Sequence, residues 1–164
     1  LGIERVALFD FDVHHGNGSE DILAGDDRVL MLSTFQRGLY PNTGDRPMGD
    51  NIINLGLPAY SGSLQMREAI HAGWIEPYRQ FAPELVFVSA GFDAHVDDDL
   101  GQLGWCDDDY VWVSKLLVQL AGETAGGRIV STLEGGYDLA ALARCVEGHV
   151  RALMHVDRHR QLVP

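Results

Sequence analysis

The sequence has few cysteines and no long apolar run. Its two cysteines, Cys106 and Cys145, lie far apart and fit no Cys-x-x-Cys pattern. They do not make a disulfide framework, and their number suits a reducing compartment, for which we take the cytoplasm. No apolar stretch approaches the roughly 18 residues that a membrane span needs, and no signal peptide is recognisable.

Basic side chains are also scarce. Lysine and arginine number 12 against 24 aspartates and glutamates, and the net charge is −12. This charge would be repelled by nucleic acid and by anionic membranes, so we expect the protein to bind neither directly. It would attract a basic peptide or a polyamine, although an acidic surface can also serve solubility alone. A homo-oligomer is compatible with the sequence.

An initiating methionine is missing as well. The chain opens with LGIERVALFDFDV and so reaches a buried-strand pattern within a few residues. We therefore expect that the preceding part of a longer protein is absent. Residues 1–164 contain no internal repeat and no linker, which predicts a single, incomplete domain. We also expect the first strand to present apolar surface and an unpaired edge.

Five short apolar runs predict the strands of a sheet. Most are continuous rather than alternating, as in parallel strands that are buried on both faces. The runs cover residues 5–11, 29–35, 51–57, 85–92 and 128–136. Helical patterns cover residues 64–80, 107–122 and 138–154. The alternation predicts an α/β fold, a three-layer α/β/α sandwich with a mostly parallel sheet.

Polar side chains gather where the predicted strands end, which is where parallel α/β sheets bind ligands. Asp10, Asp12 and His14 alternate at the end of the first strand and therefore share one side. Asp93, at another strand end, could add a third ligand to Asp12 and His14. Two aspartates and a histidine leave coordination positions open, as catalytic zinc sites do, and their oxygen-rich set also admits Fe²⁺.

Each motif also has a plainer interpretation. The Asp-x-His pair is common, and HHGNG has neither the G-x-G-x-x-G nor the P-loop spacing. His15 points away from His14 by alternation, so a structural histidine is its expected role. The LEGGY stretch could be an ordinary turn, and the loop over residues 36–50 is either functional or a surface insertion. Four further histidines are interpreted as surface or packing residues: His71, His149, His155 and His159.

Four stretches together resemble the histone deacetylase family. They are DFDVHHGNG, YPNTGD, VSAGFDAHVDDDLG and LEGGYDLAALARCV, and they follow the order and spacing of that family over nearly the whole chain. The residues of these motifs are most similar to the class II and bacterial branch, which includes deacetylase-like and acetylpolyamine amidohydrolases. The resemblance implies an arginase/deacetylase-like fold. It makes residues 1–164 the C-terminal portion of one catalytic domain whose N-terminal part is missing.

The resemblance also implies roles for particular residues. The zinc ligands would be Asp12, His14 and Asp93. Tyr137 would hydrogen-bond the substrate carbonyl and the oxyanion, and Asp10 would support a catalytic histidine. A structural K⁺ would be held by Asp10, by the carbonyls of Asp12, His14 and Thr34, and by the Ser33 hydroxyl. The walls of an acyl-lysine tunnel would include Tyr40, Leu100 and Gly136.

The sequence departs from the family pattern in a few places. The tandem catalytic histidines of the family fall upstream of residue 1. Tyr40 stands where the family usually has Phe, Asn17 where some branches have Asp, and Asp99 where Pro is usual.

The implied activity is zinc-dependent removal of acetyl groups from acetyl-lysine peptides or from acetylated amines such as acetylpolyamines. An upstream histidine would take a proton from the attacking water. The alternative is a non-catalytic module that binds metal or acetyl-lysine. We expect residues 1–164 alone to be inactive, because His95, a loop histidine without a fixed orienting partner, is the only internal candidate for the base.

Overall fold

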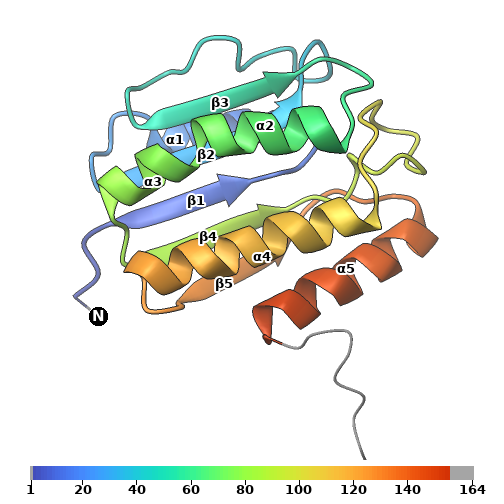
Figure 1. Ribbon diagram of the computed structural model, residues 1–164. Coiled ribbons are helices and arrows are strands. Elements are labelled where there is room, and N and C mark those ends of the chain that lie inside the picture. The colour runs from blue at the N-terminus through green and yellow to red at the C-terminus, as the bar shows by residue number, and fades with distance from the viewer. Residues whose placement is uncertain (1, 156–164) are drawn as a thin grey trace, which may run out of the picture.

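A five-stranded parallel sheet forms the framework of the protein. The structure, a computed structural model, describes residues 2–155. The strands are β1 (Val6–Asp10), β2 (Val29–Gln36), β3 (Ile52–Leu57), β4 (Leu85–Ala90) and β5 (Ile129–Leu133), in the order β3-β2-β1-β4-β5. Their arrows all point the same way in Figure 1, so their carboxyl ends gather at one edge of the sheet. The predicted parallel α/β architecture is confirmed.

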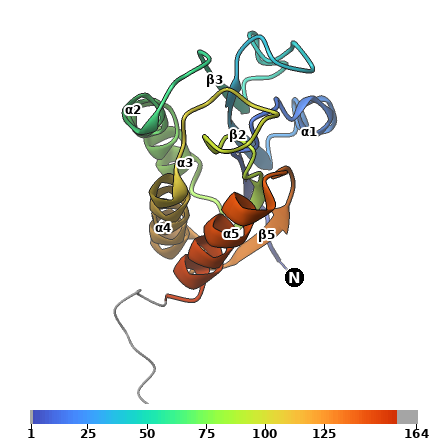
Figure 2. The ribbon, with the colours of Figure 1, turned by 90° about the vertical axis from the view of Figure 1, so that its right-hand side faces the viewer.

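Helices lie on both sides of this sheet. They are α1 (Asn17–Leu23), α2 (Ser63–Gly73), α3 (Ile75–Phe81), α4 (Asp107–Thr124) and α5 (Leu139–Leu153). Figure 2 looks onto the carboxyl edge and shows α2, α3 and α4 on one face, α1 on the other, and α5 beside α4 near β5. Within residues 2–155, one outer layer of the sandwich is therefore α1 alone. No helix of this part is both long and apolar enough to cross a membrane.

One continuous helix over residues 64–80 is a wrong prediction. Helix α2 ends at Gly73, and α3 begins after Trp74. Pro77 explains the break, because it has no N–H to donate to the Gly73 carbonyl and its ring collides with that carbonyl in a continuous helix. Trp74, at the break, is fully buried against Phe9 of β1, with ring centroids 5.1 Å apart.

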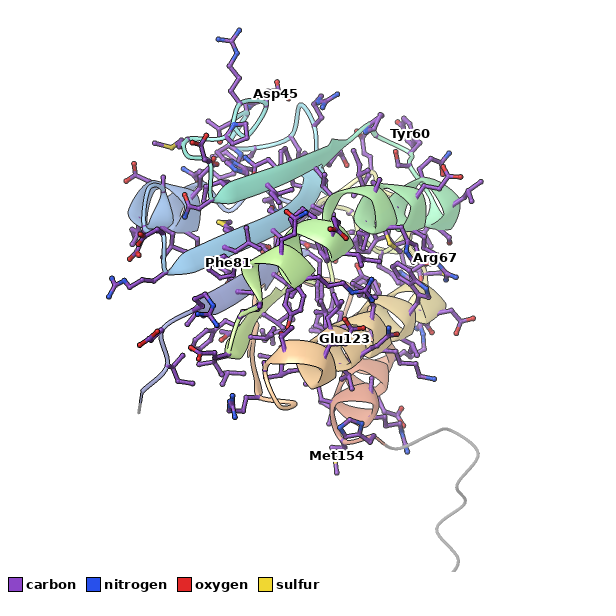
Figure 3. All side chains as sticks on the ribbon, turned by 60° about the vertical axis from the view of Figure 1, so that its left-hand side comes forward. Asp45, Tyr60, Arg67, Phe81, Glu123 and Met154 are labelled. Atoms are coloured by element: carbon purple, nitrogen blue, oxygen red, sulfur yellow. The ribbon has the colours of Figure 1, made fainter. Side chains whose placement is uncertain are left out.

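Ion pairs link α4 to α2 and α3, which lie on the same face of the sheet. Arg67 of α2 lies 2.8 Å from Asp109 of α4, and Arg79 of α3 lies 2.8 Å from Glu123 of α4. Figure 3 shows Arg67 and Glu123 on the side of the molecule where these helices lie. Asp109 also accepts a hydrogen bond from the Cys106 N–H and so caps α4. The acidic first turn of this helix matches the sequence prediction.

The expectation that the first strand forms an exposed edge is wrong. Strand β1 lies in the middle of the sheet and pairs with both β2 and β4. Exposed apolar surface lies instead on β4 and β5, at one end of a row of cross-strand partners on the α1 side: Met31, Leu8, Phe87 and Val130. Met31 is fully buried, whereas Phe87 is 39% and Val130 is 47% exposed. This face is therefore open toward β5.

The cysteines and most of the remaining histidines have structural or surface positions. Both thiols are free, with Cys106 exposed and Cys145 buried. His149 is buried between the hydroxyls of Ser114 and Ser131, at 2.7 and 2.9 Å. His71 and His155 are exposed, and His159 lies outside the described residues.

Candidate metal centre

Beyond β1, side chains continue to point alternately to the two sides, although residues 10–14 form two short turns closed by side chains. The Asp10 carboxylate accepts a hydrogen bond from the Asp12 N–H at 3.1 Å, and the Asp12 carboxylate accepts one from the His14 N–H at 2.8 Å. Phe11 and Val13 between them are fully buried in the core. Each acid thus fixes the backbone two residues ahead, which leaves the three polar side chains on one side.

Asp12, His14 and Asp93 come together at the carboxyl edge of the sheet. One potential ligand atom of each lies within 4.8 Å of the others. His14 Nδ1 is 3.0 Å from Asp12 Oδ1 and 3.2 Å from Asp93 Oδ2. Asp93 Oδ2 is fully buried and makes no hydrogen bond with the described residues. A carboxylate oxygen in this state is stabilised only by a cation or a proton, so the donor set fits a divalent ion.

The pKa values of Asp93 and Asp10 also indicate a site that favours a cation. Burial, followed by the charge of Asp12, raises the pKa of Asp93 to about 7. Burial also raises the pKa of Asp10 well above its ordinary range, with further contributions from the charges of Asp12, Glu134 and Asp93. Crowded carboxylates of this kind hold a proton that a bound cation would displace.

Two glycines make room for the carboxylates. A Cβ on Gly135 would lie 2.1 Å from Asp93 Oδ2, and one on Gly91 would lie 2.3 Å from Asp12 Oδ2. The Gly135 N–H donates to Asp12 Oδ2 at 2.8 Å. The LEGGY stretch is therefore more than a turn into a helix, because its first glycine touches both acids and orients one of them.

A cavity of about 440 Å³ opens beside this cluster. Its lining residues come from the ends of β1, β4 and β5 and from the start of α1: Asp10, Asp12, His14, His15, Gly16, Ser19, Ser89, Leu133, Glu134, Gly135 and Tyr137. Tyr137 is 57% exposed, and burial together with the charges of Asp93 and Asp12 raises its pKa. Its phenol therefore keeps its proton and can donate it to an acceptor in the cavity.

The other residues expected around the substrate lie at the rim. Tyr40 is 75% exposed, and its ring centroid is 6.5 Å from that of His14. Leu100 is 49% exposed. Gly136 has φ +137°, and a Cβ there would lie 2.8 Å from Leu142. None of the three lines the cavity, so the described residues form an open rim rather than a closed tunnel.

Of the residues expected to hold a monovalent cation, Asp10 lies at the cavity wall, whereas Ser33 and Thr34 are buried in β2. Ser33 of β2 is the register partner of Asp10 in β1. Its hydroxyl oxygen is buried without a hydrogen-bond partner among the described residues, and the same holds for the Thr34 hydroxyl. A Cβ on Gly16 would lie 2.4 Å from Asp10 Oδ2. The Asp10 carboxylate and the orphaned Ser33 oxygen fit a bound cation.

His95 is not at this site, and the expectation that it lacks an orienting partner is wrong. It is buried, its Nε2 lies 3.0 Å from Asp107 Oδ1, and its Nδ1 accepts the Asp97 N–H at 3.0 Å. A bridge between His95 and Trp105 brings the loop back to the start of α4. Asp107 follows His95 by 12 residues and lies in the next helix, so no local sequence pattern predicts that the two side chains meet.

His15 and the loop over residues 36–50 belong together. The ring of His15 pairs with the buried Glu20 at 2.5 Å and with the Thr43 hydroxyl at 2.8 Å. The Gly44 carbonyl accepts a hydrogen bond from Asn54. His15 therefore has the expected structural role, and the loop that carries Tyr40 is anchored rather than a loose insertion.

One residue of this region escapes sequence reasoning. Asp98 is buried, and its carboxylate accepts the backbone N–H groups of Tyr137 and Leu100. It is the middle member of a run of three aspartates, and residue type alone does not separate it from Asp97 and Asp99.

Comparisons with known proteins point in one direction. A family model described as "Histone deacetylase domain" matches residues 1–153. "Histone deacetylase 14, chloroplastic" of Arabidopsis thaliana is 40% identical over 162 residues, which are 95% of this chain and 38% of that protein. "Type-2 histone deacetylase 2" of Dictyostelium discoideum is 39% identical over 93% of this chain and 10% of its own length.

Solved structures agree with these relatives. The HDA15 HD domain superposes with a TM-score of 0.82 at 28% identity, over 94% of this chain and 46% of that one. The histone deacetylase Clr3 gives a TM-score of 0.84 at 27% identity, over 98% of this chain and 28% of that one. The chain thus spans less than half the length of each of these proteins.

Proposed function

Because the chain belongs to the histone deacetylase family, we propose that it forms the metal-binding part of a catalytic domain that removes acetyl groups from acetylated lysines or similar amines. The observation that carries the proposal is the orphaned Asp93 Oδ2, which faces Asp12 and His14 beside the cavity that Tyr137 lines. The named deacetylases among its relatives support a hydrolase.

The metal in this proposal is Zn²⁺, with Fe²⁺ as the alternative, held by Asp12, His14 and Asp93. Such an ion, when bound, polarises an amide carbonyl and acidifies a water molecule. The Gly135 N–H holds the Asp12 carboxylate in place. A structural K⁺ at Asp10 and Ser33 completes the proposed set of ions.

Tyr137 and Asp10 have separate roles in the proposed reaction. Tyr137 donates its phenol hydrogen to the oxygen of the amide as negative charge develops there. Asp10, at the wall of the cavity, accepts a hydrogen bond from a histidine that takes a proton from the attacking water and returns one to the amine as it leaves, with acetate as the other product. Neither histidine that lines the cavity is free for that step, since His14 faces the two aspartates and His15 pairs with Glu20. The base therefore comes from outside these residues.

The substrate class follows from charge as well as from family. The cavity wall carries Asp10, Asp12 and Glu134, and the whole chain has a net charge of −12. This field favours a cationic substrate, such as a basic peptide with acetyl-lysine or an acetylated polyamine. Nucleic acid and anionic membranes are disfavoured as partners by the same field.

The compartment is part of the proposal too. The exposed thiol of Cys106 and the buried thiol of Cys145 are both free. Free thiols of this kind persist in a reducing environment, and we propose the cytoplasm.

An assay on protein that carries both this chain and a preceding deacetylase segment tests the function. Zinc-loaded protein should deacetylate an acetyl-lysine peptide or an acetylpolyamine, and a chelator should stop the reaction. Asp12→Ala should abolish turnover, whereas Asp27→Ala, which removes an exposed acid, should leave it intact. Residues 1–164 alone should be inactive. Turnover that survives the chelator or Asp12→Ala would contradict the proposal.

A second candidate function is binding of metal or acetyl-lysine without catalysis. The observation that favours it is the lack of a free imidazole facing the cavity within residues 2–155. Binding of an acetyl-lysine peptide with no turnover, even when the preceding segment is present, would select this function over the first.

A further inference from the structure

The buried side chain of Asp98 links two loops at the carboxyl edge of the sheet. It lies between β4 and α4, in the loop that also carries Asp93 and Leu100. Asp98 is 4% exposed, whereas its neighbours Asp97 and Asp99 are exposed. A buried carboxylate needs hydrogen-bond donors, a cation or a proton at its oxygens.

Three backbone N–H groups satisfy this carboxylate. Asp98 Oδ2 accepts from Tyr137 at 2.6 Å and from Asp138 at 3.0 Å, and Oδ1 accepts from Leu100 at 3.0 Å. Tyr137 and Asp138 lie in the β5–α5 loop, about 40 residues further along the chain. One side chain therefore fastens the β5–α5 loop to the β4–α4 loop.

Tyr137 depends on this fastening. Its side chain is 57% exposed, and the phenol makes no hydrogen bond with the described residues. Gly135 is held by its N–H to Asp12 Oδ2 and by the Phe92 N–H to its carbonyl, whereas Gly136, directly before Tyr137, has φ +137° and leaves the backbone there less restrained. On the other side, Asp138 begins α5 by accepting the Ala141 N–H at 2.7 Å. Asp98 holds the chain at the point between Gly136 and the helix.

We propose that Asp98 is a positioning residue that sets where the Tyr137 phenol stands relative to the metal ligands, and that it holds Leu100 at the rim through the same carboxylate. The inference rests on the proposed function, in which Tyr137 acts on the substrate. A purely structural residue in this place would support the fold without a specific effect on Tyr137.

Amide exchange on residues 1–164 tests the contact without any assay of activity. Asp98→Asn should speed exchange at Tyr137 and Asp138 by roughly tenfold or more, as expected for the loss of hydrogen bonds to a charged group. Strand β1 should stay protected. Asp99→Asn removes the same charge from an exposed neighbour and should change neither amide.

Two results overturn the inference at this stage. One is unchanged exchange at Tyr137 and Asp138 in Asp98→Asn. The other is a loss of protection throughout the chain, both in Asp98→Asn and in Asp98→Glu, which keeps the charge one methylene further out. Asp98 would then hold the fold as a whole rather than Tyr137.

A double-mutant cycle in catalytically competent protein tests the consequence. Asp98→Asn should lower kcat by about tenfold or more with little change in KM, because the phenol acts mainly in the transition state. In a Tyr137→Phe background, the same change should cost almost nothing further. Additive losses would overturn the positioning role. Absence of turnover in unmodified protein would contradict the proposed function instead, and the exchange result would then decide the role of Asp98 by itself.

Discussion

Two clusters of similar composition lie at the carboxyl edge of the sheet, and they differ in how their polar atoms are satisfied. The first consists of Asp12, His14 and Asp93, and the second of His95, Asp107 and Cys145. In each, one potential ligand atom per residue lies within 4.8 Å of the others. By distance alone, both are candidate metal sites.

The second cluster is already neutralised. Arg144 Nε lies 2.8 Å from Asp107 Oδ2, and this contact, the largest cause, lowers the pKa of Asp107. His95 Nδ1 accepts the Asp97 N–H, so the ring proton is on Nε2 and points at Asp107. Burial raises the pKa of Cys145 to about 12, which disfavours the thiolate that a metal needs.

The first cluster has the opposite character. Two carboxylates face a single imidazole, and Asp93 Oδ2 has no hydrogen bond within the described residues. Residue type and distance alone do not separate a metal site from an ion-pair network. The feature that separates the two clusters is a buried carboxylate oxygen without a hydrogen-bond donor, which only the first cluster has among the described residues.

A large effect is expected at Tyr137, which lines the cavity beside the first cluster. In catalytically competent protein, Tyr137→Phe should lower turnover on the order of 100-fold, the usual loss for one donor to a developing oxyanion. Substrate affinity should change much less. Tyr60→Phe, at another exposed tyrosine, is the matched control and should leave turnover intact. An unchanged turnover number in Tyr137→Phe would show that the phenol only packs.

A smaller effect concerns His149, a buried histidine that belongs to neither cluster. Burial lowers its pKa from 6.5 to about 4. Well above pH 6.5 the His149 imidazole is neutral in both the folded and the unfolded protein. Between pH 6.5 and 4 it is protonated in the unfolded protein but stays mostly neutral in the folded protein, so acid favours unfolding. Its contribution to stability should fall by about 2 kcal/mol at pH 5.

Urea denaturation at pH 7.5 and pH 5 measures this loss. His149→Gln should flatten the pH dependence by that amount, while His71→Gln, at an exposed histidine, should not. If His149→Gln and the unmodified protein lose stability in parallel, His149 does not have the expected linkage.

Local rules explain which parts of the fold and site the sequence could predict. Alternation with period two placed Asp12 and His14 on one side, and the structure brings both to Asp93. Short continuous apolar runs gave all five strands within a few residues of their bounds. The break at Trp74 was also readable, because Pro77 stands one turn after it.

Long-range pairings explain what was missed. No local pattern reveals that β1 is central, that His95 meets Asp107, or that Asp98 bonds the backbone of Tyr137. Each depends on which segments become neighbours after folding. The burial of one aspartate in a run of three is likewise set by the loop that returns to it.

Metal titration of residues 1–164 tests the central claim most directly. With zinc, metal analysis and competition against a chelator should give about one ion per chain, as expected for a single mononuclear site. His14→Ala should remove this binding, whereas Asp107→Asn, in the second cluster, should keep both the stoichiometry and the affinity. Binding that survives His14→Ala and is lost in Asp107→Asn would contradict the account.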